Sequence, residues 1–182
     1  TRNGLAIRTS EPVMPLLLDG PPEIPLLSEC SGDEHLEFLR LSQELTFEPG
    51  DRIVLEGEFA RGLWILLDGR CEVLQRTATG QEQRLAALGP GDVCGELTFL
   101  NPSAQPVTVR AVTEVTAAHL SPAAFEALRQ TSPTLVASIL VGLVKLLAGR
   151  TQRPSSRPYQ GSPERAVHRP REWHDFRARL FA

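Results

Sequence analysis

Short apolar runs separated by turn-forming residues are the feature of this sequence that most constrains its fold. The expected strand segments are 45–47, 53–55, 63–66, 71–74, 84–87 and 107–109, and several of them alternate apolar with polar side chains. Turn-forming residues separate them, at Pro49-Gly50-Asp51, Asp68-Gly69, Thr79-Gly80 and Gly89-Pro90-Gly91-Asp92. Short strands with frequent tight turns are typical of an antiparallel sandwich or barrel.

Helical patterns stand on both sides of this strand region. Ser31 and Glu34 form a capping-box pattern before an apolar face, which predicts a short helix near residues 33–43. Two pairs on the C-terminal side, Ser121-Pro122 and Ser132-Pro133, each place an N-cap residue before a proline at the first helical position. We therefore expect a mainly β domain with flanking helices.

The last of these helices is apolar nearly all round. Between residues 133 and 148 its one charged residue is Lys145, and Gly149 is the expected C-cap. At about 16 residues such a helix is too short to cross a bilayer. A helix without a polar face must be covered on more than one side. It is either a core helix, or a helix that packs on its own domain with one face and on a partner with the other.

The composition divides the chain into a leader at 1–30, a folded domain at 31–149 and a tail at 150–182. The leader carries five prolines, which favour an extended segment. It is either a linker that packs on its own domain or a docking strip for a neighbouring domain. The tail has eight arginines against three acids, whereas the whole chain has a net charge of −3.

The end of the tail has an amphipathic spacing. Trp173, Phe176, Leu180 and Phe181 fall at i, i+3, i+7 and i+8, which is compatible with a short helix that folds back or docks on another chain. The tail's charge suits a solvated linker or an arm bound to a partner protein better than a contact with phosphate backbones or an acidic membrane. We expect no specific nucleic-acid partner.

Several functional classes find no support in the sequence. Its 41% hydrophobic and 23% charged residues are those of a globular protein. No Ser/His/Asp, Cys/His or paired-carboxylate motif is present, and the four histidines have no metal-ligand spacing, so we expect neither an enzyme nor a metal site. Three cysteines at no disulfide spacing, with no signal peptide and no membrane-length apolar run, suggest a cytoplasmic location or the cytoplasmic face of a membrane protein. The first residue is Thr, which suggests a processed chain or a piece of a larger protein.

The segment from Gly91 to Ala111 carries the most functional information. A strand is expected to end at Gly95, a single helical turn to follow from Glu96 to about Asn101, and a strand to resume at Val107. Free backbone N–H groups at a helix start favour an anion, and a carboxylate beside them accepts hydroxyl donors from a sugar. Within and beside this segment, Cys94 and Trp64 are interpreted as core residues rather than as a reactive thiol and a stacking platform.

These motifs, taken in order, resemble the cyclic nucleotide-binding domain family over residues 31–149. The resemblance is carried by Phe-Glu-Pro-Gly-Asp at 47–51, Gly57, the strand and turn from Trp64 to Gly69, Gly-Pro-Gly-Asp at 89–92 and Gly-Glu-Leu at 95–97. It implies an antiparallel double-stranded β-helix, also called a β-roll or jelly roll, with a short N-terminal helix and two C-terminal helices. It also implies that Gly95, Glu96, Leu97 and Thr98 line a sugar-phosphate, with Glu96 on the ribose 2′-hydroxyl, and that the last helix lies near the base and often forms a dimer contact.

The chain departs from the family pattern at the phosphate. The family places an Arg ten residues after the cassette glycine, and here that position and the next are Gln105 and Pro106, followed by Val107. No Lys or Arg lies between Arg84 and Arg110, and the alternation along the strand places Arg110 on the opposite face from the ligand. The ligand-binding candidates are therefore Gly95, Glu96, Leu97, Thr98, Gln105, Pro106 and Val107, in a degenerate cassette.

Two functions follow from this pattern. The first is a non-catalytic regulatory or interaction module, part of a larger protein or assembly, in which cAMP or cGMP binding is weakened or lost. The second is a sensor of cAMP, cGMP or another nucleotide that controls an attached channel, transporter, enzyme or assembly. The expected partners are other domains or subunits of a parent protein, or a second copy bound through helix 133–148. The candidate contact residues are Leu140, Leu143, Leu147, Trp173 and Phe176.

Overall fold

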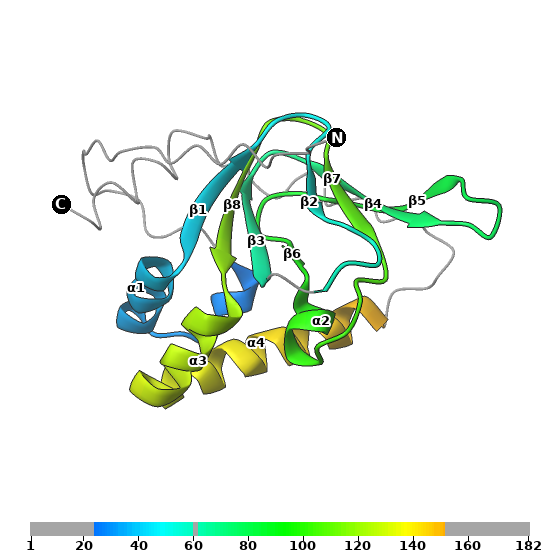
Figure 1. The fold of residues 1–182 in the computed structure, drawn as a ribbon. Coiled ribbons are helices and arrows are strands. Elements are labelled where there is room, and N and C mark those ends of the chain that lie inside the picture. The colour runs from blue at the N-terminus through cyan, green and yellow to red at the C-terminus, as the bar shows by residue number, and fades with distance from the viewer. Residues whose placement is uncertain (1–23, 60–61, 152–182) are drawn as a thin grey trace.

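Two four-stranded antiparallel sheets form the body of the molecule in this computed structural model, which describes residues 24–59 and 62–151 (Figure 1). One sheet has the order β1-β8-β3-β6 and the other β2-β7-β4-β5. The strands are β1 Gln43–Phe47, β2 Arg52–Val54, β3 Leu63–Asp68, β4 Cys71–Arg76, β5 Glu82–Leu88, β6 Val93–Cys94, β7 Thr108–Ala111 and β8 Val115–Leu120. The antiparallel roll with flanking helices expected from the sequence is confirmed.

Each strand segment expected from the sequence overlaps an observed strand, but β8 was not expected. Its sequence, VTAAHL, shows no clear alternation of apolar and polar side chains. The structure supplies the reason, because β8 pairs with β1 on one side and with β3 on the other and is buried at five of its six residues. A strand covered on both faces loses the two-residue period by which strands are recognised.

The core has two parts, one on each side of the sheet that contains β3. Between the two sheets, Phe47, Trp64, Leu66 and Val109 belong to one buried cluster. On the outer side of that sheet, Leu63, Ile65 and Leu120 belong to a second cluster shared with the helices. The alternation of neighbouring β3 residues between the clusters is the two-residue period of a strand.

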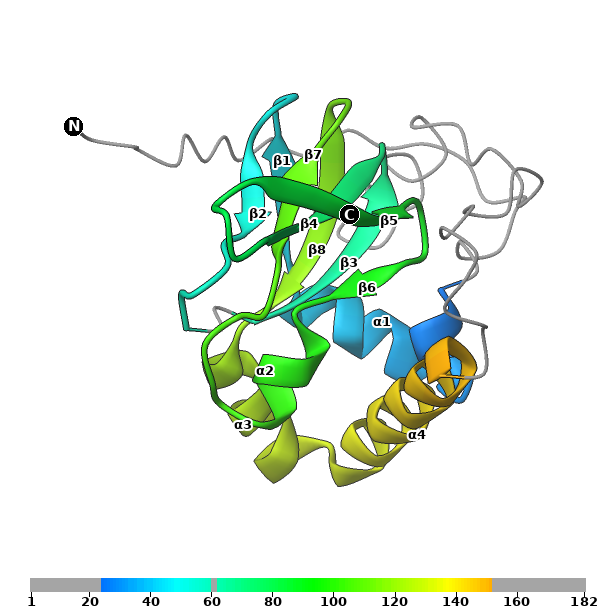
Figure 2. The same cartoon turned by 90° about the vertical axis from the view of Figure 1, so that its right-hand side faces the viewer.

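The helices gather at one end of the roll (Figure 1 and Figure 2). They are α1 Gly32–Leu41, α2 Glu96–Leu100, α3 Pro122–Thr131 and α4 Pro133–Thr151, with a 3₁₀ turn, η1, at Pro25–Leu27. The capping box before α1 is confirmed: the Ser31 backbone N–H donates to the Glu34 carboxylate at 2.8 Å, and the Glu34 N–H donates to the Ser31 hydroxyl at 3.3 Å. The expected cap at Ser121 is also present, because its hydroxyl accepts from the Ala124 N–H at 3.1 Å.

Helix α4 is longer than the sequence pattern suggested. It runs for 19 residues through Gly149, whose φ is not positive, so the prediction of Gly149 as the C-cap is wrong. By length and composition Pro133–Arg150 is also long and apolar enough to cross a membrane, which corrects the expectation that it is too short. Core helices pass the same test, and Leu135, Ile139 and Leu143 are buried against the domain. The opposite side of α4 leaves Leu140, Val141 and Val144 exposed.

The segment just before α1 packs on α4. Leu26 and Leu27 of η1 are buried in the same cluster as the inner face of α4, and Lys145 pairs with Glu29 at 2.6 Å. Gly142 makes this crossing fit, because a Cβ at that position would lie 1.9 Å from the carbonyl oxygen of Leu26. The remainder of the leader, residues 1–23, lies outside the described residues, and so does the amphipathic segment expected at 173–181.

Candidate functional site

A cavity of about 100 Å³ lies where β6, α2 and the segment before β7 meet the C-terminal end of α4. The residues that line it are Val54, Val73, Leu88, Val93, Cys94, Gly95, Glu96, Leu97, Gln105, Pro106, Val107, Val109 and Arg150. Pockets that enclose drug-sized ligands usually measure about 300–1,000 Å³, so this cavity is small. Six of the seven predicted ligand-binding residues line it, and Thr98 does not.

The turn from β6 into α2 depends on Gly95. This residue has φ +80°, in the left-handed region that only glycine adopts without strain. A Cβ here would lie 2.6 Å from the carbonyl oxygen of Gly62 and 3.3 Å from the Trp64 ring. Both the positive φ and the close approach of the Gly62 segment therefore require glycine at position 95. The turn that Gly95 makes sets the position of the Glu96 backbone.

The Glu96 carboxylate is buried, with 9% of its side chain exposed, and it forms an ion pair with Arg150. Nη1 of Arg150 donates to Oε1 of Glu96, and Nη2 donates to the backbone carbonyl oxygen of Val93 at 2.6 Å. A buried carboxylate is costly unless it is paired, and the Arg150 guanidinium supplies that partner for Glu96.

Arg150 is the site residue that sequence reasoning missed. It was assigned to the basic tail because α4 was expected to end at Gly149. The helix continues, and its last turn brings the Arg150 side chain, 38% of which is exposed, to the cavity. One signal in the sequence indicates a longer helix. Arg150 comes directly after the expected helix end, and a basic residue stabilises the C-terminal turn of a helix.

Residues 105–107, where the sequence departs from the family pattern, form another wall of the cavity. Gln105 is buried, and its backbone pairs with the loop before residue 60: the Gly57 N–H donates to the Gln105 carbonyl at 2.9 Å, and the Gln105 N–H donates to the Glu58 carbonyl at 2.8 Å. No hydrogen bond of the Gln105 side-chain amide is found among the described residues. Pro106 follows with no N–H to donate. The wall thus offers a neutral amide where the family pattern has a guanidinium.

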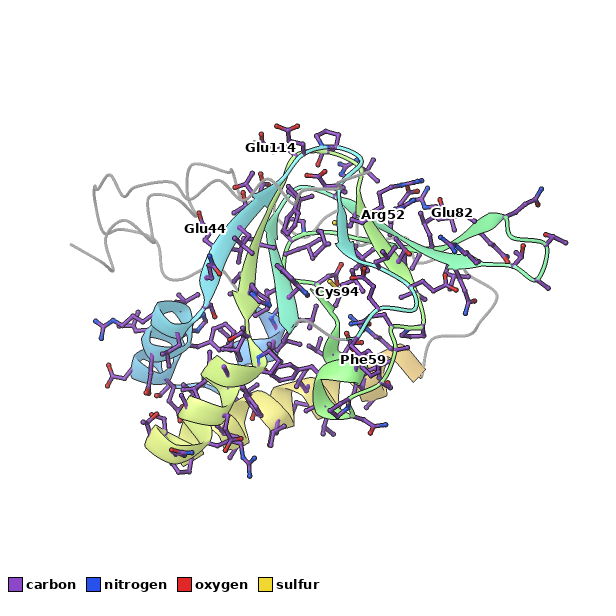
Figure 3. The ribbon with its side chains drawn as sticks, in the orientation of Figure 1. Glu44, Arg52, Phe59, Glu82, Cys94 and Glu114 are labelled. Atoms are coloured by element: carbon purple, nitrogen blue, oxygen red, sulfur yellow. The ribbon has the colours of Figure 1, made fainter. Side chains whose placement is uncertain are left out.

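Three residues near the cavity, Thr98, Cys94 and Trp64, are buried. Thr98 is a buried residue of α2, and its hydroxyl donates to the Gly95 carbonyl at 3.3 Å. Cys94 lies inside the roll (Figure 3), and burial raises the pKa of its thiol. Trp64 is buried and stacks on His119 with ring centroids 4.0 Å apart, which confirms the core interpretation.

Arg110 does not rescue the phosphate site. Its guanidinium donates to Glu72 at 2.8 Å and to Glu82 at 3.1 Å on the outer face of the β2-β7-β4-β5 sheet. Arg52 joins the same network through Glu82, and Figure 3 shows both side chains beside the β4–β5 hairpin. The prediction that Arg110 faces away from the ligand is confirmed, because it does not line the cavity.

The charge of the cavity is therefore balanced within the chain. Among the described lining residues, Glu96 is the one carboxylate and Arg150 the one cation, and they are paired with each other. The other side chains are apolar or, at Gln105, neutral and polar. The described residues also include no group of three or more His, Cys, Asp or Glu side chains that could hold a metal ion.

The predicted partner-contact residues do not share one surface. Leu140 lies on the exposed side of α4 and Leu147 is half-buried. Leu143 is only 1% exposed and belongs to the helix core cluster, so its assignment as a partner contact is wrong. Leu140 and Leu143 are neighbours one turn apart on α4, but Leu143 points into the core while Leu140 lies at the edge of the exposed side. Trp173 and Phe176 lie outside the described residues.

Residues 44–132 match the family model described as the cyclic nucleotide-binding domain. A CRP-like cAMP-activated global transcriptional regulator of Mycobacterium tuberculosis is 27% identical over 63% of this chain and 49% of its own length. A cAMP-dependent protein kinase regulatory subunit of Yarrowia lipolytica is 30% identical over 58% of this chain and 28% of its own length. The chain thus spans about half or less of these curated relatives.

Solved structures show the same fold. A cyclic nucleotide-binding domain from Methylobacillus flagellatus aligns with a TM-score of 0.66 at 21% identity, covering 70% of this chain and 75% of that one. The regulatory subunit of a cAMP-independent protein kinase A from Trypanosoma brucei aligns at 0.59 and 33% identity, covering 72% and 44%. Its counterpart from Trypanosoma cruzi, bound to guanosine, aligns at 0.59 and 28% identity, covering 72% and 43%.

The fold, the order of the cassette motifs and these matches define the class of protein. Residues 44–132 form a domain of the cyclic nucleotide-binding family.

Proposed function

We propose that this chain is a non-catalytic regulatory module in which cAMP and cGMP binding is weakened, and that it acts through contacts within a larger protein or assembly. One observation carries the proposal: the position that should hold the phosphate-binding Arg is Gln105, and the guanidinium that does line the cavity is already paired with Glu96. A cyclic phosphate entering the cavity would find no unpaired cation among the described lining residues.

The size of the effect follows from the interaction that is lost. A hydrogen bond to a charged group contributes roughly 1.5–3 kcal/mol, and a buried anion without its counter-charge costs more. At about 1.4 kcal/mol per decade, the loss corresponds to roughly ten- to a hundredfold in affinity, or more. Pro106 adds to it, because it supplies neither an N–H nor a hydroxyl to the phosphate.

The trypanosomal relative supports the same interpretation. That relative is the regulatory subunit of a cAMP-independent protein kinase A. A variant of it with three substitutions, one of which introduces an arginine in place of a threonine, is bound to cAMP. By analogy, we expect that an arginine introduced into the cassette of this chain favours binding of the cyclic phosphate.

Isothermal titration calorimetry of the whole chain with cAMP and with cGMP tests the proposal. We expect dissociation constants well above 10 µM for both nucleotides. A constant below about 10 µM for either one would overturn the proposal and establish the chain as a sensor of that nucleotide. Circular dichroism of the same sample shows that a weak result comes from folded protein.

A second candidate is a sensor of an uncharged nucleoside. The observation that favours it is the neutral charge balance of the cavity, where Oε2 of Glu96 takes no part in the Nη1–Oε1 contact with Arg150 and Gln105 offers an amide. The structure from Trypanosoma cruzi is of a related subunit bound to guanosine. Titration with guanosine and adenosine distinguishes this function from a module that acts by contact alone.

The exposed side of α4 is the surface through which we propose that the module meets a second copy of itself. Leu140, Val141 and Val144 form an apolar stripe there, with 36%, 45% and 65% of each residue exposed. Leu140→Asp should leave a folded monomer, whereas the unsubstituted chain should sediment as a dimer. Leu143→Asp should fail to fold, because Leu143 is core. A monomeric unsubstituted chain would contradict the proposal.

A cytoplasmic location, or one at the cytoplasmic face of a membrane protein, stays a prediction.

A further inference from the structure

Arg150 reaches the cavity from an element that lies outside the cassette. It belongs to the last turn of α4, 54 residues after Glu96 in the chain. Two separate contacts, with the Glu96 carboxylate and with the Val93 carbonyl, hold the guanidinium against β6 and the start of α2. Because two contacts hold the Arg150 guanidinium, its orientation in the site is fixed.

The guanidinium still has donors to offer. It carries five N–H bonds, and the two contacts that it makes with described residues use one each on Nη1 and Nη2. The side chain is 38% exposed and lines the cavity, so the unused donors are accessible to a molecule that enters. Its positive charge, however, is already balanced by the adjacent carboxylate.

Charge balance then decides which ligands suit the cavity. With Glu96 and Arg150 paired, the cavity walls are formally neutral. An uncharged ligand with hydroxyl groups keeps this balance and can donate to the carboxylate. A monoanion leaves one negative charge without a partner in a partly buried site, and that charge is costly.

We propose that the Glu96–Arg150 pair sets the charge selectivity of the cavity: it masks the cation that α4 supplies, and so favours an uncharged, hydroxyl-bearing ligand such as a nucleoside over the corresponding cyclic phosphate. Arg150 is then a specificity-determining residue that acts in place of the missing cassette arginine once its charge is unmasked. The inference rests on the proposed function in so far as the cavity is taken to be a ligand site.

The test is the substitution Glu96→Gln, which keeps the shape of the side chain and removes its charge. Guanosine with cGMP, and adenosine with cAMP, are titrated into the unsubstituted chain and into the variant by calorimetry. Because the variant leaves Arg150 without its counter-charge, the affinity for each cyclic nucleotide relative to its nucleoside should rise at least tenfold. Arg150→Gln should change the same ratio in the opposite direction, since it leaves the carboxylate uncompensated.

The matched control is Glu126→Gln, which breaks the exposed Glu126–Arg129 pair on α3 and should leave the ratio unchanged. A ratio in Glu96→Gln that is unchanged or lower overturns the inference, and so does a lack of binding of all four probes to both proteins at millimolar concentration. The proposed function fails on a different result, namely tight binding of cAMP or cGMP by the unsubstituted chain. Melting curves of each variant confirm that the proteins compared are folded.

Discussion

At the scale of single residues, the cavity is shaped by positions where one added atom has no room. Gly95 and Gly80 have nearly the same backbone, with φ +80° and +82°, but different surroundings. A Cβ at Gly95 would meet the Gly62 carbonyl oxygen at 2.6 Å, whereas a Cβ at Gly80, in the β4–β5 hairpin, would meet nothing within 4 Å. The pair separates the cost of a left-handed backbone from the cost of crowding.

Gly95→Ala should therefore destabilise the domain more than Gly80→Ala does. The left-handed conformation alone costs an L-residue about 1–2 kcal/mol, and both variants bear that cost. Crowding in a packed region adds roughly 1–3 kcal/mol at position 95 only. Urea denaturation of the two variants measures the difference, and equal losses of stability would contradict the packing described around Gly95.

His35 gives the domain a dependence on pH. It is buried in α1, its Nε2 has no hydrogen-bond partner among the described residues, and desolvation lowers its pKa in the folded state. In the unfolded chain His35 has a pKa near 6.5, so just below that pH the unfolded chain binds a proton at His35 and the folded chain does not. Stability should be fully present above about pH 6.5 and fall as the pH drops below it. His35→Leu should flatten this part of the profile, and a profile identical to that of the unsubstituted chain would rule His35 out.

At the scale of elements, α4 connects three parts of the molecule. Its inner face forms the helix core, its middle crosses η1, and its last turn brings Arg150 to the cavity. The crossing depends on Gly142, which is a poor helix former in isolation but lets the Leu26 backbone pass close to the helix. The exposed pair between Lys145 and Glu29 accompanies this contact, and pairs of this kind contribute little.

Two glycines of α4 should respond to alanine with opposite signs. Gly149→Ala should stabilise the chain by roughly 0.5–1 kcal/mol, because alanine favours a helix and a Cβ there meets nothing within 4 Å. Gly142→Ala should destabilise it by about 1–3 kcal/mol, because its Cβ would lie 1.9 Å from the Leu26 carbonyl oxygen and would displace η1. Thermal melting distinguishes the two, and stabilisation by both would mean that η1 does not pack on α4.

At the scale of the whole molecule, the local patterns of the sequence predicted most of the fold. Turn residues and short alternating runs marked six of the eight strands and the end of β6, a capping-box pattern marked the start of α1, and serine–proline pairs marked the starts of α3 and α4. These signals are local, since a turn or a cap is made by residues close together in the chain. Strand β8 lacked the signal because both of its faces are covered.

The sequence predicted the cavity residues that come from the cassette but not the one that comes from α4. The cassette from Gly95 to Val107 is contiguous, so its residues were found together from the sequence. Arg150 was not found, because its position depends on how far α4 continues and on how the helix packs across the domain. The fit of Gly142 against Leu26 escaped prediction for the same reason, since contacts between distant segments leave no periodic trace in the sequence.

The central claim is that this cavity lacks a free cation for a cyclic phosphate. Its most direct test is calorimetric titration of cAMP into the double variant Gln105→Arg, Pro106→Ser beside the unsubstituted chain. We expect the variant to bind cAMP more tightly by one to several decades. An unchanged affinity in a folded variant would contradict it, because the phosphate site would then not lie beside residues 105 and 106.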